Sequence, residues 1–301
     1  MIQNPIPWPN GAKCAAAITF DIDTDSFLHL EYGDRVPDMV SSTSWLRYDG
    51  IAVPRLLKIF REYDLRQTFF YPAWCMEQHP KLVEMILEGG HEIGHHGYLH
   101  ESPNRLTRED ELHWLQRSTE TIVRMTGQKP RGYRAPVYNF SRDTADLLAQ
   151  EGFLYDSSLM TDDVPNLIRT GSGNLIELPT HWAMDDWPHY VHNIELQYMM
   201  SIRTPDEAKA VYLSEFDFAY EHGGLWLAIW HPWVSARGPR AQAISQMIRY
   251  IMDKGDVWFA TLEEIATHIN ACIAEGSYTP RAIDLPYYTG ALPDDQRPKQ
   301  I

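Results

Sequence analysis

The chain has 301 residues, 44% of them hydrophobic, which suffices for one large α/β domain or two ordinary ones. Acidic residues outnumber basic residues by 41 to 26, so the net charge is −15. Such a surface repels phosphate backbones and anionic lipid, and no basic stripe interrupts it. We therefore expect neither nucleic acid nor a membrane as a partner.

The sequence carries no recognisable signal for export or membrane insertion. Residues 1–9 have neither the positive nor the apolar region of a secretory signal. The apolar runs at 14–20 and 225–230 are too short to cross a bilayer. Three scattered cysteines fit the reduced thiols of a cytosolic protein, so we expect a cytoplasmic location.

Strand and helix patterns alternate along the whole chain. Short apolar runs predict strands at residues 15–20, 67–71, 91–95, 131–134, 153–155, 175–178, 225–230 and 257–259. Capping residues, glycine stops and periodicity predict helices near 54–60 and at 80–87, 107–126, 144–150, 204–222, 240–253 and 262–274. Residues 26–46 are predicted to be a loop.

This alternation predicts a parallel sheet covered by helices. The fold class that we expect is α/β, as a distorted (β/α) barrel of seven or eight units, closed or partly open. We predict a single domain over residues 1–277. The proline-rich residues 278–301 are predicted to form an irregular tail.

Four of the thirteen histidines lie between His91 and His100. His91 and His95 fall on a predicted strand, where four residues span about 13 Å, too far for one ion. His96 and His100 follow that strand, where the chain should turn or begin a helix and i,i+4 side chains lie about 5–6 Å apart. Neutral imidazoles at this spacing suit a divalent transition metal. The alternative is a histidine-rich polar loop, and the pair alone does not decide between them.

Two carboxylates, Asp21 and Asp23, follow the first predicted strand and share one face of it. Functional residues of parallel barrels sit at the carboxyl ends of strands. Two carboxylates there repel each other and need a cation or a shared proton, although acids at a strand end are more often solvated. One aspartate with two histidines forms a three-ligand set that leaves room for water, as in catalytic metal sites.

Two further polar residues end predicted strands. His231 follows the buried run at 225–230, where a lone histidine is more often structural. Arg134 ends the fourth predicted strand, where it could hold a carboxylate ionised or form an ordinary surface ion pair.

Taken together, these segments resemble the five ordered motifs of the polysaccharide deacetylase superfamily (carbohydrate esterase family 4). The resemblance runs over roughly residues 13–268. The matching segments, in family order, are Thr19–Asp23 for Thr-Phe-Asp-Asp, His96–His100 for His-x-x-x-His, Arg134–Tyr138 for Arg-x-Pro-Tyr, Tyr155–Ser158 for the aspartate motif and Leu227–His231 for the strand ending in histidine.

The resemblance implies a barrel of the NodB-homology type and hydrolysis of a C–N acyl bond. It implies that zinc, or another divalent transition metal, is held by Asp23, His96 and His100.

It also implies the catalytic roles. Asp21 is the expected base, held ionised by Arg134. His231 is the expected acid, and Asp156 is expected to orient the site. Backbone N–H groups near Val137 and Tyr138 are candidates for stabilising the oxyanion.

The departures from the family pattern concern the substrate. The spacing Asp-x-Asp, the long segment after the first strand and the sequence Glu177–Trp182 look most like an intracellular subgroup. That subgroup has peptidoglycan-deacetylase-like, allantoinase-type and cyclic imide hydrolase members. We therefore expect a small soluble cyclic imide or amide as substrate. The alternatives are N-deacetylation of peptidoglycan or another N-acetylated polysaccharide and, more remotely, an inactive binding barrel.

Two apolar insertions, 27–45 and 182–200, follow strand ends and should overhang the metal, leaving a closed pocket. The alternative is that both insertions form subunit contacts. Exposed aromatic residues at Trp45, Trp182–Trp187 and Tyr287-Tyr288, together with the family resemblance, predict a homo-oligomer, a tetramer.

Overall fold

Strand β1 (Cys14–Asp21) is the buried centre of the fold, with all eight residues inaccessible to solvent or nearly so. The computed structural model describes residues 2–293. One edge of β1 pairs in parallel with β10 (Leu225–Trp230). The other edge pairs with β11 (Val257–Phe259) near its start and with β2 (Thr68–Tyr71) near its end. The carboxyl ends of β1, β2 and β10 therefore meet at one end of the sheet.

The main sheet has ten strands and is mostly parallel. Its order is β10, β1, β2, β3, β4, β5, β7, β6, β12, with β11 paired to β1 off this path. The remaining strands are β3 (Glu92–His95), β4 (Gly132–Tyr133), β5 (Tyr155–Asp156), β6 (Asn166–Arg169), β7 (Asn174–Glu177) and β12 (Ala282–Asp284). Only β6 and β7 pair antiparallel among the described strands of this sheet. A parallel bridge from Asp185 to Ile229 brings the chain after β7 back to the other edge of β10. The expected α/β fold is thus confirmed.

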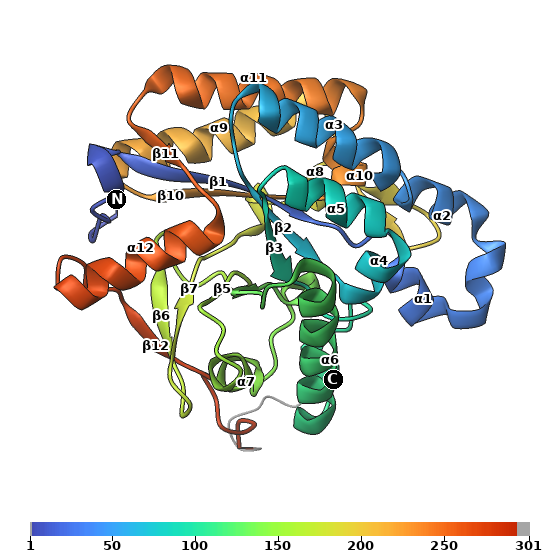
Figure 1. The fold of residues 1–301 in the computed structure, drawn as a ribbon, viewed down its shortest axis with the longest axis horizontal. Coiled ribbons are helices and arrows are strands. Elements are labelled where there is room, and N and C mark those ends of the chain that lie inside the picture. Colours follow the sequence, from blue (N-terminus) through green and yellow to red (C-terminus); the bar gives the residue numbers. More distant parts are fainter. Residues whose placement is uncertain (1, 294–301) are drawn as a thin grey trace.

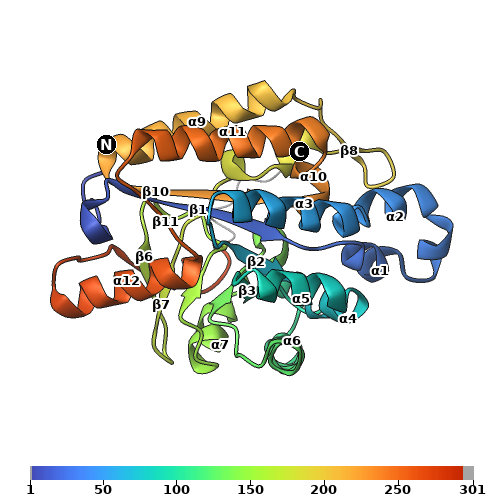
Figure 2. The same ribbon diagram turned by 45° about the horizontal axis from the view of Figure 1, so that its top comes forward.

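Helices pack around this sheet. They are α3 (Asp49–Glu62), α4 (Ala73–Gln78), α5 (Pro80–Glu88), α6 (Arg108–Thr126), α7 (Thr144–Gln150), α9 (Pro205–His222), α11 (Gly238–Lys254) and α12 (Leu262–Glu275). Figures 1 and 2 show α9, α11 and α3 over one side of β1 and β10, with α4 to α7 on the other side. Thr204 and Thr261 form capping boxes at the starts of α9 and α12, and the cap-based prediction of the start of α9 is confirmed.

The prediction of a loop over residues 26–46 is wrong. This segment forms α1 (Ser26–Tyr32), the 3₁₀ helix η2 (Gly33–Asp38) and α2 (Val40–Leu46). Leu28, Val36 and Leu46 are buried in the core, whereas no side chain caps α1 or α2. Packing rather than capping therefore holds these helices, which explains why the local sequence signal was weak.

The second insertion also has structure. It contains η5 (Trp182–Met184), α8 (Trp187–Tyr190) and a two-stranded sheet of β8 (His192–Asn193) and β9 (Tyr198–Met199). The other short helical segments of the chain are η1 (Pro9–Gly11), η3 (Pro103–Arg105), η4 (Pro136–Tyr138) and α10 (Pro232–Ser235).

The tail is more regular than expected. Strand β12 pairs in parallel with β6, and Ile283 is buried in a small core cluster with Ile168 and Leu175. A single apolar residue in a proline-rich stretch predicts no strand, so this pairing was missed. Residues 294–301 of the predicted tail lie outside the described residues.

The three cysteines are free thiols, as their scattered spacing predicted. Cys14, Cys75 and Cys272 are free and buried. Between residues 2 and 293, no helix combines the length and the apolar character needed to cross a membrane.

His91 and His95 are structural, as the strand spacing predicted. The Gln67 N–H donates to Nδ1 of His91 at 3.0 Å, and the ring of His95 bonds to the Leu115 carbonyl at 3.2 Å. Burial lowers the pKa of His91 to about 4 and that of His95 to about 3. Both side chains are therefore neutral parts of the core at physiological pH.

This burial predicts a pH dependence of stability. In the unfolded chain His91 takes a proton near pH 6.5, so between that pH and about 4 the unfolded state binds more protons and acid favours unfolding. His91 should remove about 3 kcal/mol from the free energy of unfolding of the metal-free protein between pH 7 and pH 4. His91→Gln keeps an acceptor for the Gln67 N–H and should flatten this part of the profile in urea titrations. A profile identical to that of the wild type would contradict the assignment.

Candidate metal centre

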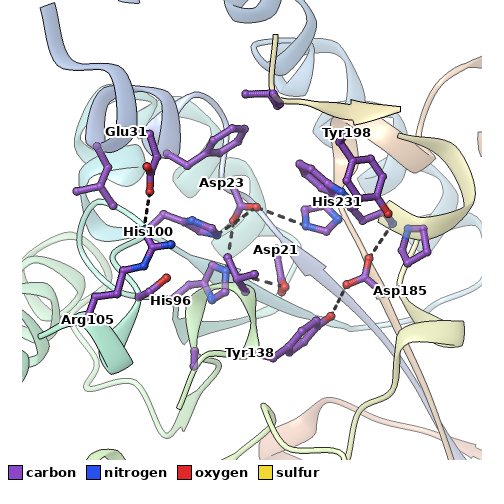
Figure 3. Close-up of a pocket in the computed structure, with 18 of the residues that line it drawn as sticks. Asp21, Asp23, Glu31, His96, His100, Arg105, Tyr138, Asp185, Tyr198 and His231 are labelled. Carbon is purple, nitrogen blue, oxygen red and sulfur yellow. Dashed lines mark hydrogen bonds and ion pairs between the residues drawn. The ribbon is translucent and has the colours of Figure 1, made fainter. Parts of the chain in front are cut away.

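Three predicted ligands converge at the carboxyl ends of β1 and β3. Oδ1 of Asp23 lies 3.3 Å from Nε2 of His96, and Oδ2 lies 3.6 Å from Nε2 of His100. Each residue offers one ligand atom, and these atoms lie within 4.8 Å of one another. Figure 3 shows both imidazoles turned toward the Asp23 carboxylate.

A tight turn, rather than a helix, brings the two histidines together. Gly97 has φ +74° and His100 has φ +63°, a left-handed conformation that is uncommon for a residue with a side chain. The Glu101 carboxylate closes the turn by accepting the N–H groups of Tyr98 and Leu99 at 2.8 and 2.7 Å. Strain of this kind persists where the surrounding structure fixes it, often at functional sites.

A hydrogen bond sets the tautomer of His96. Nδ1 lies 2.7 Å from the Arg134 carbonyl oxygen, which can only accept, so Nδ1 carries the proton. In the neutral ring the unprotonated Nε2 then faces Asp23, although burial is outweighed by Asp21 and Asp23, which raise the pKa of His96 in the absence of a metal. Metal-binding histidines are oriented in this way by a carbonyl on the far nitrogen.

The Asp23 carboxylate shows that these residues fit a cation. Asp23 is 2% exposed, and Oδ1 has no hydrogen-bond partner among the described residues. Burial alone would raise the pKa of Asp23, but His100, His231 and His96 lower it well below its usual range. A buried, ionised oxygen without a donor lacks the stabilisation that a metal ion supplies. One carboxylate and two imidazoles are ligands that zinc accepts.

Asp21 forms a buried ion pair with Arg134, as the sequence predicted. Nη1 of Arg134 donates to Oδ1 of Asp21 and to Oγ1 of Thr19, each at 2.8 Å. The other guanidinium nitrogens donate to the carbonyl and hydroxyl of Ser157, both at 2.9 Å. Oδ2 of Asp21 remains on the side of His96, 4.0 Å from its Nε2.

His231 faces Asp23 from the opposite side of the site. Its Nε2 lies 3.4 Å from Oδ2 of Asp23, and its Nδ1 lies 2.6 Å from Oδ1 of Asp186. Burial would lower the pKa of His231, but Asp186 and then Asp23 raise it well above its usual value. The structure thus gives His231 a buried carboxylate partner that sequence reasoning missed.

Asp186 lies inside the apolar insertion, 45 residues before His231 in the chain. Its Oδ2 also accepts the backbone N–H of His231 at 2.9 Å and the hydroxyl of Ser235 at 2.5 Å. Asp186 and His231 are thus bonded to each other, and with Asp185 they form a second group of residues that could hold a metal ion. The only sequence signal was a pair of acids within an apolar segment.

Asp156 is not among the residues that line the pocket. Its carboxylate accepts the hydroxyl of Ser158 at 2.7 Å and the N–H of Ser158 at 2.9 Å. Ser158 in turn accepts the N–H of Ala135 at 2.8 Å. Asp156 is therefore connected to the site through Ser158 and the backbone N–H of Ala135, which follows Arg134. Asp186, in contrast, contacts the predicted catalytic residue His231 directly.

The cluster lies at the base of a pocket of about 680 Å³. Both apolar insertions contribute to its walls, as predicted, with Phe27, Leu30 and Tyr32 from the first and Trp182, Trp187, Leu196 and Tyr198 from the second. The insertions also contact each other. The hydroxyl of Ser42 donates to Glu195 Oε2 at 2.5 Å, and that of Tyr32 to the Glu195 carbonyl at 3.3 Å.

The prediction that the aromatic residues at Trp45, Trp182–Trp187 and Tyr287-Tyr288 are exposed is only partly right. Trp182, Tyr287 and Tyr288 are exposed. Trp45 packs edge-on against the buried Trp233 at 4.4 Å between ring centroids, and Trp187 lines the pocket.

Several known proteins are similar to this chain over most of its length. The family model for polysaccharide deacetylases matches residues 38–155. The peptidoglycan deacetylase of Helicobacter pylori is 31% identical over 279 residues, covering 83% of this chain and 94% of that protein. A polysaccharide deacetylase-type structure from Mycobacterium smegmatis is 37% identical with a TM-score of 0.88, covering 96% of this chain and 99% of that one. PuuE allantoinase shares the fold, with a TM-score of 0.78 at 23% identity over 92% of this chain and 96% of that one.

The metal assignment predicts the behaviour of single variants. His96→Ala leaves two protein ligands, which rarely hold zinc, and should lose bound zinc on dialysis against buffer. Asp23→Asn should lose zinc as well. His91→Gln alters a neighbouring histidine outside the cluster and should retain one zinc per chain by atomic emission. Stoichiometric zinc in folded His96→Ala protein would exclude this ligand set.

Proposed function

Because the chain belongs to the polysaccharide deacetylase family, we propose that it is a zinc-dependent hydrolase of C–N bonds other than peptide bonds, acting on a small soluble cyclic imide or amide. The observation that carries this proposal is that residues of both insertions form walls of the pocket at the candidate metal centre. Hydrogen bonds from Ser42 and Tyr32 to Glu195 join the insertions beside the pocket. A volume of about 680 Å³ falls in the range of small-molecule sites, whereas a polymer needs an open groove.

The residues supply the acid–base chemistry of such a reaction. A divalent ion held by Asp23, His96 and His100 would lower the pKa of a coordinated water and polarise the substrate carbonyl. Oδ2 of Asp21, whose other oxygen is held by Arg134, takes a proton from the attacking water. The attacking nucleophile is thus generated next to the substrate carbonyl and does not have to come from free hydroxide in solution.

His231 completes the reaction at the departing nitrogen. Its Nδ1 is held by Asp186, so Nε2 is the atom that gives the proton to nitrogen, a poor leaving group otherwise.

The turn at Val137 and Tyr138, where the oxyanion donors were expected, has positive φ at both residues, 55° and 58°. The N–H of Tyr138 donates to the Ala135 carbonyl within this turn, at 2.9 Å, so this predicted oxyanion donor already has a partner.

A second candidate is N-deacetylation of peptidoglycan. The relative from Helicobacter pylori bears that name and matches 83% of this chain. The same base, acid and ligand set serve an acetamido group equally well. An inactive binding barrel is disfavoured, because Arg134 pairs with the proposed base Asp21 and Asp186 pairs with the proposed acid His231.

The cytoplasmic location and the homotetramer stay predictions. Exposed apolar side chains at Val40, Ile194, Met199, Met200 and Ile202 offer surface for contacts between copies of the chain.

The pocket walls formed by the two insertions predict a preference for small substrates over oligosaccharides. Zinc-loaded protein should hydrolyse succinimide with at least tenfold higher kcat/KM than a chitin or peptidoglycan tetrasaccharide, because the insertions exclude the chain of sugars. Ser42→Ala weakens the contact between the insertions and should narrow this difference. Faster turnover of the oligosaccharide by the wild type would favour the second candidate.

The Asp186–His231 pair predicts a pH effect. His231 acts while protonated, so activity falls as pH rises through its pKa. Asp186→Asn removes the charge that raises this pKa, so the alkaline limb of kcat/KM should move to lower pH and kcat should drop by roughly 10²-fold. Ser235→Ala removes another hydrogen bond to Asp186 and should leave the limb in place. An alkaline limb at the wild-type pH in Asp186→Asn would show that His231 is not the acid.

A further inference from the structure

A second polar pair faces the pocket across from the metal ligands. The Tyr138 hydroxyl donates to Oδ2 of Asp185, and Oδ1 of Asp185 accepts the Trp187 N–H at 2.7 Å. Both Tyr138 and Asp185 line the pocket, although Asp185 is only 3% exposed. Figure 3 places this pair on the side of His231, away from His96 and His100. The acid–base steps described above use neither residue.

The pair offers hydrogen-bond acceptors to the pocket. The phenol gives its only proton to Asp185, so the Tyr138 oxygen presents lone pairs, and the carboxylate oxygens can accept further bonds. Burial raises the pKa of Asp185 to about 6, which leaves the carboxylate largely ionised at pH 7.5. A ligand group that binds here must therefore be a donor.

The pair is placed to hold the departing nitrogen. One carboxylate oxygen of Asp185 lies within 4.8 Å of a ring nitrogen of His231. An N–H group bonded to the pair thus lies near the ring of His231, the proposed acid. The surroundings are apolar, because Trp182 packs edge-on against Tyr138 at 5.0 Å between centroids. A hydrogen bond in such surroundings is stronger than one in water.

We propose that Tyr138 and Asp185 form a specificity element that accepts a hydrogen bond from the N–H of the scissile imide or amide. The element selects substrates whose scissile nitrogen carries a hydrogen over those whose nitrogen is fully substituted, and it aligns the nitrogen with His231. The inference rests on the proposed hydrolysis of C–N bonds and holds for either substrate candidate. The alternative is that Asp185 only fixes the start of α8 through the Trp187 N–H.

The test compares succinimide with N-methylsuccinimide as substrates of the zinc-loaded protein. The wild type should favour succinimide by at least tenfold in kcat/KM, because the N-methyl compound leaves the acceptors unpaired. Tyr138→Phe and Asp185→Asn should each bring the ratio to within threefold of one, through loss of succinimide turnover alone. Tyr250→Phe removes another phenol that donates to a carboxylate, that of Asp217, away from the pocket lining, and should keep the wild-type ratio.

Other outcomes separate the explanations. An unchanged ratio in folded, zinc-containing Tyr138→Phe would overturn the proposal, since simple steric exclusion of the methyl group survives this isosteric change. An equal loss for both substrates would assign Asp185 a structural role and also overturn it. If the wild type hydrolyses neither imide, the proposed function fails. The proposed specificity element is then tested separately, by calorimetric binding of the two imides. Tighter binding of succinimide that disappears in Tyr138→Phe supports it, and equal binding refutes it.

Discussion

The buried guanidinium of Arg134 is the interaction on which the site depends. Arg134 is 0% exposed and donates to Asp21, Thr19 and Ser157, while its charged carbon lies 4.2 Å from the ring centre of Phe70. Its carbonyl also fixes His96. A buried charge is tolerated only when its donors are satisfied, and removing one partner costs about 3–5 kcal/mol. One residue thus joins the base, a metal ligand and segments from β1, β2 and the end of β5.

The same constraint explains the electrostatics around Asp23. Parallel pairing of β1 with β2 and β10 brings Asp23, His96 and His231 to one end of the sheet. Because Arg134 already compensates Asp21, the charge of Asp23 has only imidazoles around it, and Oδ1 is left without a donor. The fold therefore places a buried carboxylate oxygen without a hydrogen-bond donor at the point where a cation would bind.

Residues at strand ends were predictable from the sequence, and residues in the insertions were not. Asp21, Asp23, His96, His100, Arg134 and His231 each follow a strand that apolar runs and glycine stops reveal, and parallel pairing brings such positions together. Asp186 follows no strand and finds His231 through an insertion whose path is fixed by burial of aromatic side chains. The helices of residues 26–46 and strand β12 were missed for a related reason: distant packing, rather than local caps or periodicity, holds them.

The central claim is that Asp23, His96 and His100 hold a single divalent ion. Crystals of the zinc-loaded protein, measured on both sides of the zinc absorption edge, test it most directly. The account predicts one anomalous peak, about 2.0–2.2 Å from a carboxylate oxygen of Asp23 and from Nε2 of His96 and of His100. A peak among Asp185, Asp186 and His231 instead, or no peak at full zinc loading, would contradict it.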